Sequence, residues 1–388
     1  MWGIISTAFL GMYCLMGYYI GRRGWHVFGK SSAPGFRSFY WVFSGLIVFA
    51  FPIAEIGEDF MPAAGALWLN LWSGYSMIAV VYIFLFLLLI DFFRFTDKVI
   101  GYIPARIKEN DKTPIMLGVS VLVTVIIILA YGTWNARNPV VTEYDIKVDK
   151  QAGSLTELRI AMISDIHYGT IIDAQRLESM VRIINELKPD LILFAGDIIE
   201  GSPTQPEARK LMAVFNQMGV RYGMAAVPGN HDRALRNGGE VLRYFEEAGI
   251  TVLRDNYIKL ANAFYVIGRD DPGHGSRERK ELSELMSGID SSYPIILLDH
   301  QPIDLGAAQK SNIDLQLSGH THRGQVFPSQ LITGKIFELD WGLLKKDDYH
   351  LVVSSGYGTW GPPLRIGNHP EVVFLKVSFG YMEPSIVD

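Results

Sequence analysis

The first third of the chain consists largely of long stretches without a charged residue. These stretches cover residues 1–21, 38–54, 60–90 and 113–136. Because a helix rises about 1.5 Å per residue, each stretch can cover about 30 Å of hydrocarbon, the second only barely. The pattern predicts an α-helical membrane domain over residues 1–136 with four transmembrane helices. A cleaved secretory signal would explain only the first stretch, which lacks a basic start and a small-residue cleavage site.

The rest of the chain alternates short apolar runs with amphipathic segments. Residues 137–157 are predicted to form a linker and a leading strand, and residues 158–388 a separate α/β domain. Five runs rich in β-branched and aliphatic residues are typical of buried strands: 158–163, 191–194, 224–227, 295–298 and 315–317. Apolar residues at helical spacing follow at 173–188, where Asp173 can cap the helix, and again at 211–218 and 241–245. Strands therefore alternate with helices, as in βαβ units.

A polar patch follows each of the five apolar runs. The patches are Asp165-Ile166-His167, Gly196-Asp197, Gly229-Asn230-His231-Asp232, Asp299-His300 and Gly319-His320-Thr321-His322. A single aspartate at a strand end is usually a cap or turn residue, and a single histidine is usually a hydrogen-bonded polar group. Since open α/β sheets collect ligand-binding groups at the carboxyl ends of their strands, five such patches are expected to form one cluster.

The side chains in these patches suit divalent metal ions. Carboxylate, imidazole and amide donors without a thiolate favour ions such as Zn²⁺, Mn²⁺ or Fe. Two cations about 3.5–4 Å apart can clamp a phosphoryl group and stabilise charge on the attacking and leaving oxygens. Because the patches supply enough donors for two ions, the sequence predicts a binuclear metal centre.

In this order, D-x-H, G-D, G-N-H-D, H and G-H-x-H resemble the motifs of the calcineurin-like metallophosphoesterases, bacterial membrane-associated members included. The resemblance covers residues 158–388 and implies two packed mixed β-sheets flanked by helices. It also implies a metal-dependent phosphodiesterase or phosphatase that attacks phosphoester bonds with a metal-bound hydroxide. By the same likeness, two divalent ions (Zn, Mn or Fe) would be held by Asp165, His167 and His322, by Asn230, His300 and His320, and by Asp197 as the bridge.

The resemblance leaves His231 free for catalysis. It is similar to the family histidine that contacts the substrate phosphate and helps to protonate the leaving oxygen, and we hypothesise that Asp232 orients it. The chain departs from the family after Asp197, where many members carry an arginine and this sequence reads Ile-Ile-Glu-Gly. Arg323 is one candidate for the missing positive charge.

The distribution of basic residues predicts the orientation of the membrane domain. Lysine and arginine gather in the first and third loops between the predicted helices, whereas the second loop carries only acidic residues. Because positively charged loops stay in the cytoplasm, four spans place the catalytic domain on the extracytoplasmic side of the cell membrane. A re-entrant second stretch would reverse this orientation. The single cysteine, Cys14, permits no intrachain disulfide, so the compartment is not constrained by redox chemistry.

These features predict a membrane-bound phosphoesterase that acts on a lipid-linked or cell-envelope substrate. The formal charge of −5 and the lack of a basic cluster in the second half argue against nucleic acid as a partner. Two alternatives stay open: a cytoplasm-facing hydrolase resembling UDP-diacylglucosamine pyrophosphatase, and a non-catalytic metal-binding scaffold. Two further segments are of interest: the loop containing His274 could border the site, and the apolar and basic residues 341–346 could touch lipid headgroups, although an ordinary turn and ordinary packing are favoured.

Overall fold

The structure, a computed structural model, describes residues 2–29, 35–57, 63–169, 171–201, 205–234, 238–272 and 279–380. Contacts within the chain divide it into two units. The first comprises Met1–Thr133 and Gly361–Pro363, and the second comprises Trp134–Trp360 and Leu364–Asp388. His274 lies outside the described residues.

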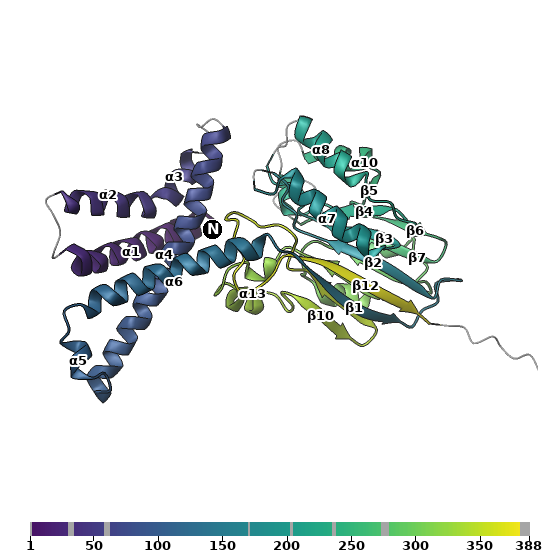
Figure 1. The fold of residues 1–388 in the computed structure, drawn as a ribbon. Helices are drawn as coiled ribbons and strands as arrows, with labels where there is room; N and C mark the ends of the chain where they lie inside the picture. The colour runs from purple at the N-terminus through teal and green to yellow at the C-terminus, as the bar shows by residue number, and fades with distance from the viewer. Residues whose placement is uncertain are drawn as a thin grey trace, which may run out of the picture. The chain divides into compact units, whose positions relative to one another are not determined.

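The first unit is helical (Figure 1). Its helices are α1 (Trp2–Phe28), α2 (Phe36–Val48), α3 (Ala50–Gly57), α4 (Ala63–Ile100), α5 (Ala105–Lys108) and α6 (Thr113–Ala136). Within the described residues, two helices are long and apolar enough to cross a membrane, Gly65–Ile100 of α4 and the whole of α6. Helix α4 continues beyond the predicted end at residue 90. Asp91 has partners on α1, since the Tyr19 hydroxyl and the Arg23 guanidinium both bond its carboxylate.

The second predicted span is divided in the structure. It forms α2 and α3, which have 13 and 8 residues. At about 1.5 Å per residue, α2 alone extends about 20 Å, which is less than the hydrocarbon thickness of a bilayer. The number of four spans therefore stays a prediction, with this segment as its weakest part.

The second unit contains two six-stranded mixed sheets. The first has the order β1 (Val140–Val148), β12 (Glu371–Phe379), β2 (Glu157–Ile163), β3 (Leu191–Ala195), β4 (Met224–Val227), β5 (Ile250–Val252). The second has the order β10 (Gly342–Lys346), β11 (Tyr349–Val353), β9 (Leu315–Ser318), β8 (Ile295–Leu298), β7 (Phe264–Gly268), β6 (Asn256–Leu260). All five predicted buried strands are present, as are the two mixed sheets. The leading strand β1 pairs with β12 along its whole length, so the α/β unit begins before residue 158.

Helices cover the outer face of each sheet. Helices α7 (Ala174–Leu187), α8 (Gln205–Phe215) and α10 (Gly238–Glu247) contribute to a core with the first sheet (Figure 1), and α11 (Leu282–Met286) and α12 (Leu305–Lys310) to a core with the second. Asp173 caps α7 as predicted, because its side chain accepts a hydrogen bond from the Arg176 amide.

The side chains of β2 show how the layers form. Ala161 and Ile163 belong to the core under the helices, whereas Ile160 and Met162 belong to the core between the two sheets. This alternation buries both faces of the strand, as its continuous apolar sequence predicts. Because the two sheets pack face to face, the strands β2, β3, β4, β8 and β9 present their carboxyl ends to a common region.

Candidate metal centre

The five polar patches follow five different strands, three from the first sheet and two from the second. Asp165 and His167 follow β2, Asp197 follows β3, and Asn230 begins the short helix α9 (Asn230–Ala234) after β4. His300 follows β8, and the Gly319-His320-Thr321-His322 patch follows β9. The structure brings the seven predicted ligands together, as the contacts below describe.

Several of these residues have an unusual backbone conformation. Asp165, His167, Asp197, His320 and His322 all have φ between 47° and 71°. An L-residue in this left-handed region costs about 1–2 kcal/mol, so surrounding contacts must hold it there. The Asp165 amide donates to the Gly196 carbonyl at 2.9 Å, and the His167 amide donates to the Asp197 carbonyl at 3.1 Å. The loops therefore fix each other, and the strained backbone aims the side chains inward.

Two glycines of the motifs make room for ligands from other strands. A Cβ atom on Gly229 would collide with the Asp197 carboxylate, and one on Gly319 would collide with the Asp165 carboxylate. Each glycine therefore permits a close approach of backbone to carboxylate. This explains physically why the patches read G-N-H and G-H.

The first group of donors consists of Asp165, His167 and His322. The Nε2 atoms of the two histidines lie 3.1 Å apart, and His322 Nε2 lies 3.4 Å from Asp165 Oδ1. Two imidazole nitrogens at this distance need a shared proton or a cation between them. The arrangement fits a divalent ion, to which each nitrogen can offer its lone pair.

The second group consists of Asp197, His300 and His320, with Asn230 among them. Asn230 Oδ1 lies 2.8 Å from His320 Nδ1 and 3.2 Å from His300 Nε2. Asp197 Oδ2 lies 3.2 Å from His300 Nε2 and 4.0 Å from His167 Nε2 of the first group. Asp197 therefore stands between the two groups, where a bridging carboxylate is expected.

Hydrogen bonds on the far side of two imidazoles prepare them as ligands. His300 Nδ1 donates to the Ala195 carbonyl at 2.7 Å, and His167 Nδ1 donates to Glu200 Oε2 at 2.6 Å. Each bond fixes the tautomer that leaves Nε2 free to face the site, which is the usual arrangement for metal-bound histidine.

Burial and neighbouring charges set the protonation of the donors. Burial and the nearby His300 lower the pKa of His320 to about 4, and burial with His167 lowers the pKa of His322 well below its usual value. Burial alone would raise the pKa of Asp197, but His300, His167 and His231 outweigh it and hold that pKa low. His320 and His322 are thus neutral and Asp197 is ionised, the forms that bind a metal ion. Burial alone would lower the pKa of His300, but Asp197 outweighs burial and raises that pKa well above its usual value, so that a metal ion would have to displace a proton from His300.

His231 lies beside the ligands and differs from them in exposure. Its side chain is 27% exposed, whereas those of His167 and His300 are at most 1% exposed. Its backbone amide donates to Asp197 Oδ1 at 2.8 Å, and its ring packs edge-on against His167 at 4.9 Å between centroids. This places a titratable ring at the open side of the site.

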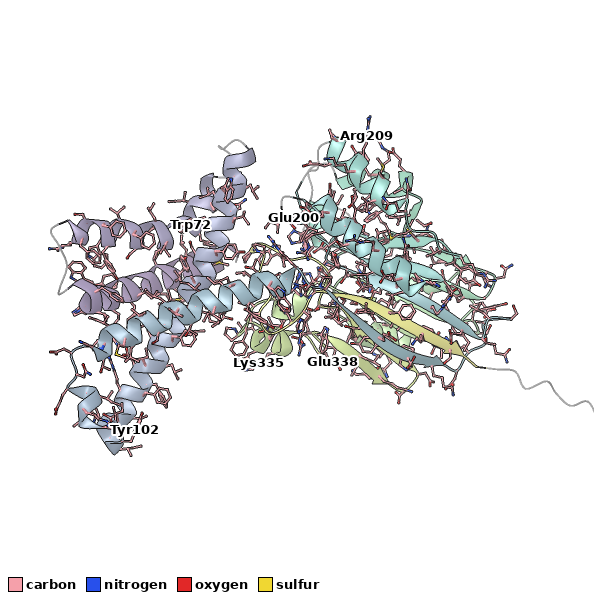
Figure 2. The ribbon with its side chains drawn as sticks, viewed as in Figure 1. Trp72, Tyr102, Glu200, Arg209, Lys335 and Glu338 are labelled. Carbon is pink, nitrogen blue, oxygen red and sulfur yellow. The ribbon has the colours of Figure 1, made fainter. Side chains whose placement is uncertain are left out.

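The partner of the His231 ring is Glu200. This residue lies in the segment after Asp197 where many family members carry an arginine, and the sequence assigns it no role. His231 Nδ1 lies 3.0 Å from Glu200 Oε2, the same carboxylate that accepts the His167 bond. Burial lowers the pKa of His231, but the bond to Glu200 outweighs it and raises that pKa above its usual value. Glu200 is labelled in Figure 2. The carboxylate therefore joins the expected proton donor to a metal ligand.

Asp232, which we expected to orient His231, has different partners. Its fully buried carboxylate accepts hydrogen bonds from the backbone amides of Ile198, Ile199 and Gly229 at 2.9–3.1 Å. Burial and the nearby Asp197 raise its pKa to about 6. Asp232 thus fixes the loop that follows Asp197, and a direct catalytic role stays a prediction.

Two arginines near the site carry positive charge. Arg323 is the candidate named from the sequence, and Arg365 is an additional one. Arg323 lies over the Trp341 ring, 4.0 Å from its centroid. Arg365 was not predicted: it is fully buried, donates to the Gly356 and Gly358 carbonyls, and lies 3.4 Å from His322 Nδ1. Because Arg365 is buried, it supports the ligand loops and does not reach a substrate.

Comparisons with known proteins agree with this geometry. The family model for calcineurin-like phosphoesterases matches residues 158–324. An uncharacterized metallophosphoesterase from Aquifex aeolicus is 31% identical over 61% of this chain and 91% of its own length. One from Helicobacter pylori is 28% identical over 96% of this chain and 98% of its own length.

A third relative is named as a transmembrane protein. A transmembrane protein with a metallophosphoesterase domain from Danio rerio is 29% identical over 79% of this chain and 72% of its own length. The matched stretches therefore extend beyond the α/β unit into the helical part. Together with the ligand motifs and the Aquifex relative, these matches show that the chain belongs to the calcineurin-like metallophosphoesterase family.

Proposed function

We propose that this protein is a membrane-anchored phosphoesterase that uses two divalent metal ions to hydrolyse a lipid-linked or cell-envelope phosphoester. The convergence of seven nitrogen and oxygen donors, with Asp197 between the two groups, carries this proposal. A complete donor set disfavours a non-catalytic scaffold.

The chain's own residues divide the work of hydrolysis. Bound cations would supply Lewis-acid activation of the phosphoryl group and of a water molecule. His231 faces the substrate and carries the proton that the leaving oxygen needs. Glu200 holds the His231 ring in place through Nδ1, so that Nε2 is the atom that delivers this proton.

The helical part supports a substrate in or near the membrane. Helices α4 and α6 meet the length and composition of membrane spans, and α6 ends only a few residues before β1. Such a short connection confines the active site to the neighbourhood of the bilayer surface. Lipid-linked phosphoesters are the substrates at the highest local concentration there.

A panel of phosphoesters tests this function. We expect full-length protein loaded with Zn²⁺, Mn²⁺ or Fe²⁺ to hydrolyse at least one ester, and a chelator to abolish the activity. Turnover of phospholipid esters in nanodiscs is expected to exceed that of soluble aryl phosphates at equal concentration. Protein with a full complement of two metal ions that hydrolyses no ester in the panel would instead be a scaffold.

The orientation proposed here is extracytoplasmic, and the distribution of basic loops supports it. A reporter fused after Ala136 is expected to be active outside the cytoplasm, with a fusion in the basic loop at residues 101–112 as the cytoplasmic control. The reverse pattern would mean that the divided segment α2–α3 does not cross the bilayer. It would favour the cytoplasm-facing alternative.

A further inference from the structure

The short helix α13 (Gln330–Ile336) and the turn before it expose large apolar side chains. Ile336, Leu331, Ile332 and Phe327 are 68%, 63%, 61% and 48% exposed. We call these four residues the α13 surface. The only charged side chain on α13 is Lys335. Exposed apolar groups clustered in this way mark a site of interaction.

The α13 surface is held close to the end of helix α6. Asn135, in the last turn of α6, is buried and donates to the carbonyls of Arg365 and Asn368 at 2.9 and 2.6 Å. Between these two residues, the Ile366 carbonyl accepts bonds from the Phe327 amide and from Gln330 Nε2. A short series of direct hydrogen bonds thus joins the end of α6 to the start of α13.

A transmembrane helix ends at the membrane–water interface, so this connection places α13 at the same level. Trp134, in the last turn of α6, is 60% exposed, and tryptophan is enriched at this interface. Lys335 lies among the apolar side chains of α13, where a long basic side chain can reach lipid phosphates while its stem stays in apolar surroundings. Apolar side chains with a basic residue are typical of elements that lie in the interface.

We propose that the α13 surface inserts into the interfacial layer of the lipid bilayer, at the level of the last turn of α6, and brings the metal centre to the depth of the lipid phosphates. The insertion itself is independent of catalysis. The presentation of lipid phosphates to the metal centre rests on the proposed function.

The segment after α13 leads directly to the metal centre. The Phe337 ring, one residue past the helix, packs edge-on against the His320 ring at 6.0 Å between centroids. The Thr321 hydroxyl, between His320 and His322, donates to the Asp340 carbonyl at 2.6 Å. Because these contacts join α13 to the ligand loop, a lipid headgroup beside α13 lies at the entrance of the site.

From the sequence, residues 341–346 could touch lipid headgroups, although ordinary packing is favoured. In the structure these residues belong largely to β10, where Leu344 packs against the core of the second sheet and Lys346 pairs with Glu338. The greater apolar exposure lies on α13.

The depth of α13 can be measured with single-cysteine labels in the full-length protein. Cys14→Ser removes the only cysteine and provides the background. An environment-sensitive fluorophore is then attached at Ile332→Cys or, independently, Leu331→Cys, and as a control at Arg209→Cys on α8. Figure 2 shows Arg209 and Lys335 on opposite sides of the α/β unit. The protein is reconstituted in phosphatidylglycerol–phosphatidylcholine nanodiscs, with and without lipids that carry a nitroxide near the headgroup.

We expect the nitroxide lipids to quench the labels on α13 several-fold more than the label at Arg209. Equal quenching at both places would overturn the insertion. So would unquenched α13 labels together with disulfide crosslinking of the unlabelled cysteine variants between two copies of the chain, since the surface would then bind a second protomer.

The role in catalysis has its own measurement. Ile332→Glu is expected to lower the ratio of lipid to soluble ester turnover by about tenfold, because it removes one inserted side chain. Gln217→Glu adds the same charge at an exposed position just after α8 and should leave this ratio as in the wild type. Quenching with an unchanged ratio would leave insertion standing and refute lipid presentation. Quenching without hydrolysis of any ester would refute the proposed function alone.

Discussion

Asp197→Asn is expected to lower phosphoester turnover at least about 100-fold and to leave the protein with fewer than two bound metal ions. Loss of a residue that merely supports a ligand costs about 10–100-fold in metal affinity or activity, so loss of the bridging charge should cost more. The amide that replaces the carboxylate carries no charge, although Asp197 Oδ1 also accepts the His231 amide. Metal content and turnover, both measured on purified full-length protein, check this result.

The matched control is Asp190→Asn, because Asp190 immediately precedes the same strand, β3, at its opposite end. Its carboxylate bonds the Arg159 backbone and side chain and takes no part in the site. This variant should keep turnover within about twofold of the wild type. If Asp197→Asn binds two ions and turns over normally, Asp197 does not bridge them.

His231→Ala is expected to lower kcat by about 10²–10⁴-fold while both metal ions stay bound. The reason is that, in the proposed mechanism, the partly exposed His231 supplies the proton, whereas the seven other side chains would hold the ions. A kcat decrease without metal loss separates this role from that of a ligand. The variant should lose least with a substrate whose leaving group needs no proton, such as an ester of an acidic phenol.

Two further variants delimit the role of His231. Glu200→Gln keeps the size of the side chain but removes its charge, so we expect a smaller decrease in turnover, about 10–100-fold. His369→Ala removes an exposed histidine whose described hydrogen bonds involve only its backbone carbonyl, and it should change kcat little. A loss of metal from His231→Ala equal to that from Asp197→Asn would contradict the assignment of His231 as proton donor.

The strands and the clustering of the polar patches could be predicted because one local rule governs both. Each buried strand is a short apolar run, and each polar patch follows directly at its carboxyl end, so the position of a patch in sequence places it at the end of its strand. The positive φ angles of Asp165 and Asp197 could not be predicted, because they depend on backbone hydrogen bonds between loops that are distant in sequence.

Glu200 and Arg365 could not be assigned from the sequence for different reasons. Glu200 follows the Gly-Asp patch, in a segment where the family often has an arginine. Its contact with His231 depends on side-chain geometry, which no motif indicates. Arg365 lies more than forty residues after the last ligand, in a segment without a motif. Asp232 shows the opposite error. Because it follows His231 in sequence, we expected a contact between the two side chains, but its carboxylate accepts hydrogen bonds from backbone amides instead.

The division of the second apolar stretch reflects another limit. Composition indicates that residues 38–54 are apolar, but not where a helix is interrupted, and the break at Phe49 leaves two short helices. The exposure of α13 likewise depends on tertiary packing.

The origin of the ligands has a consequence for how the protein holds together. Each donor group draws on both sheets: Asp165 and His167 come from the first and His322 from the second, and Asp197 and His300 are divided in the same way. An ion bound at either place would cross-link two halves of the domain across more than one hundred residues of chain. Chelation would thus lower the free energy of unfolding of the domain as well as stop hydrolysis. The stability of the folded domain would therefore depend on the concentration of free metal ion.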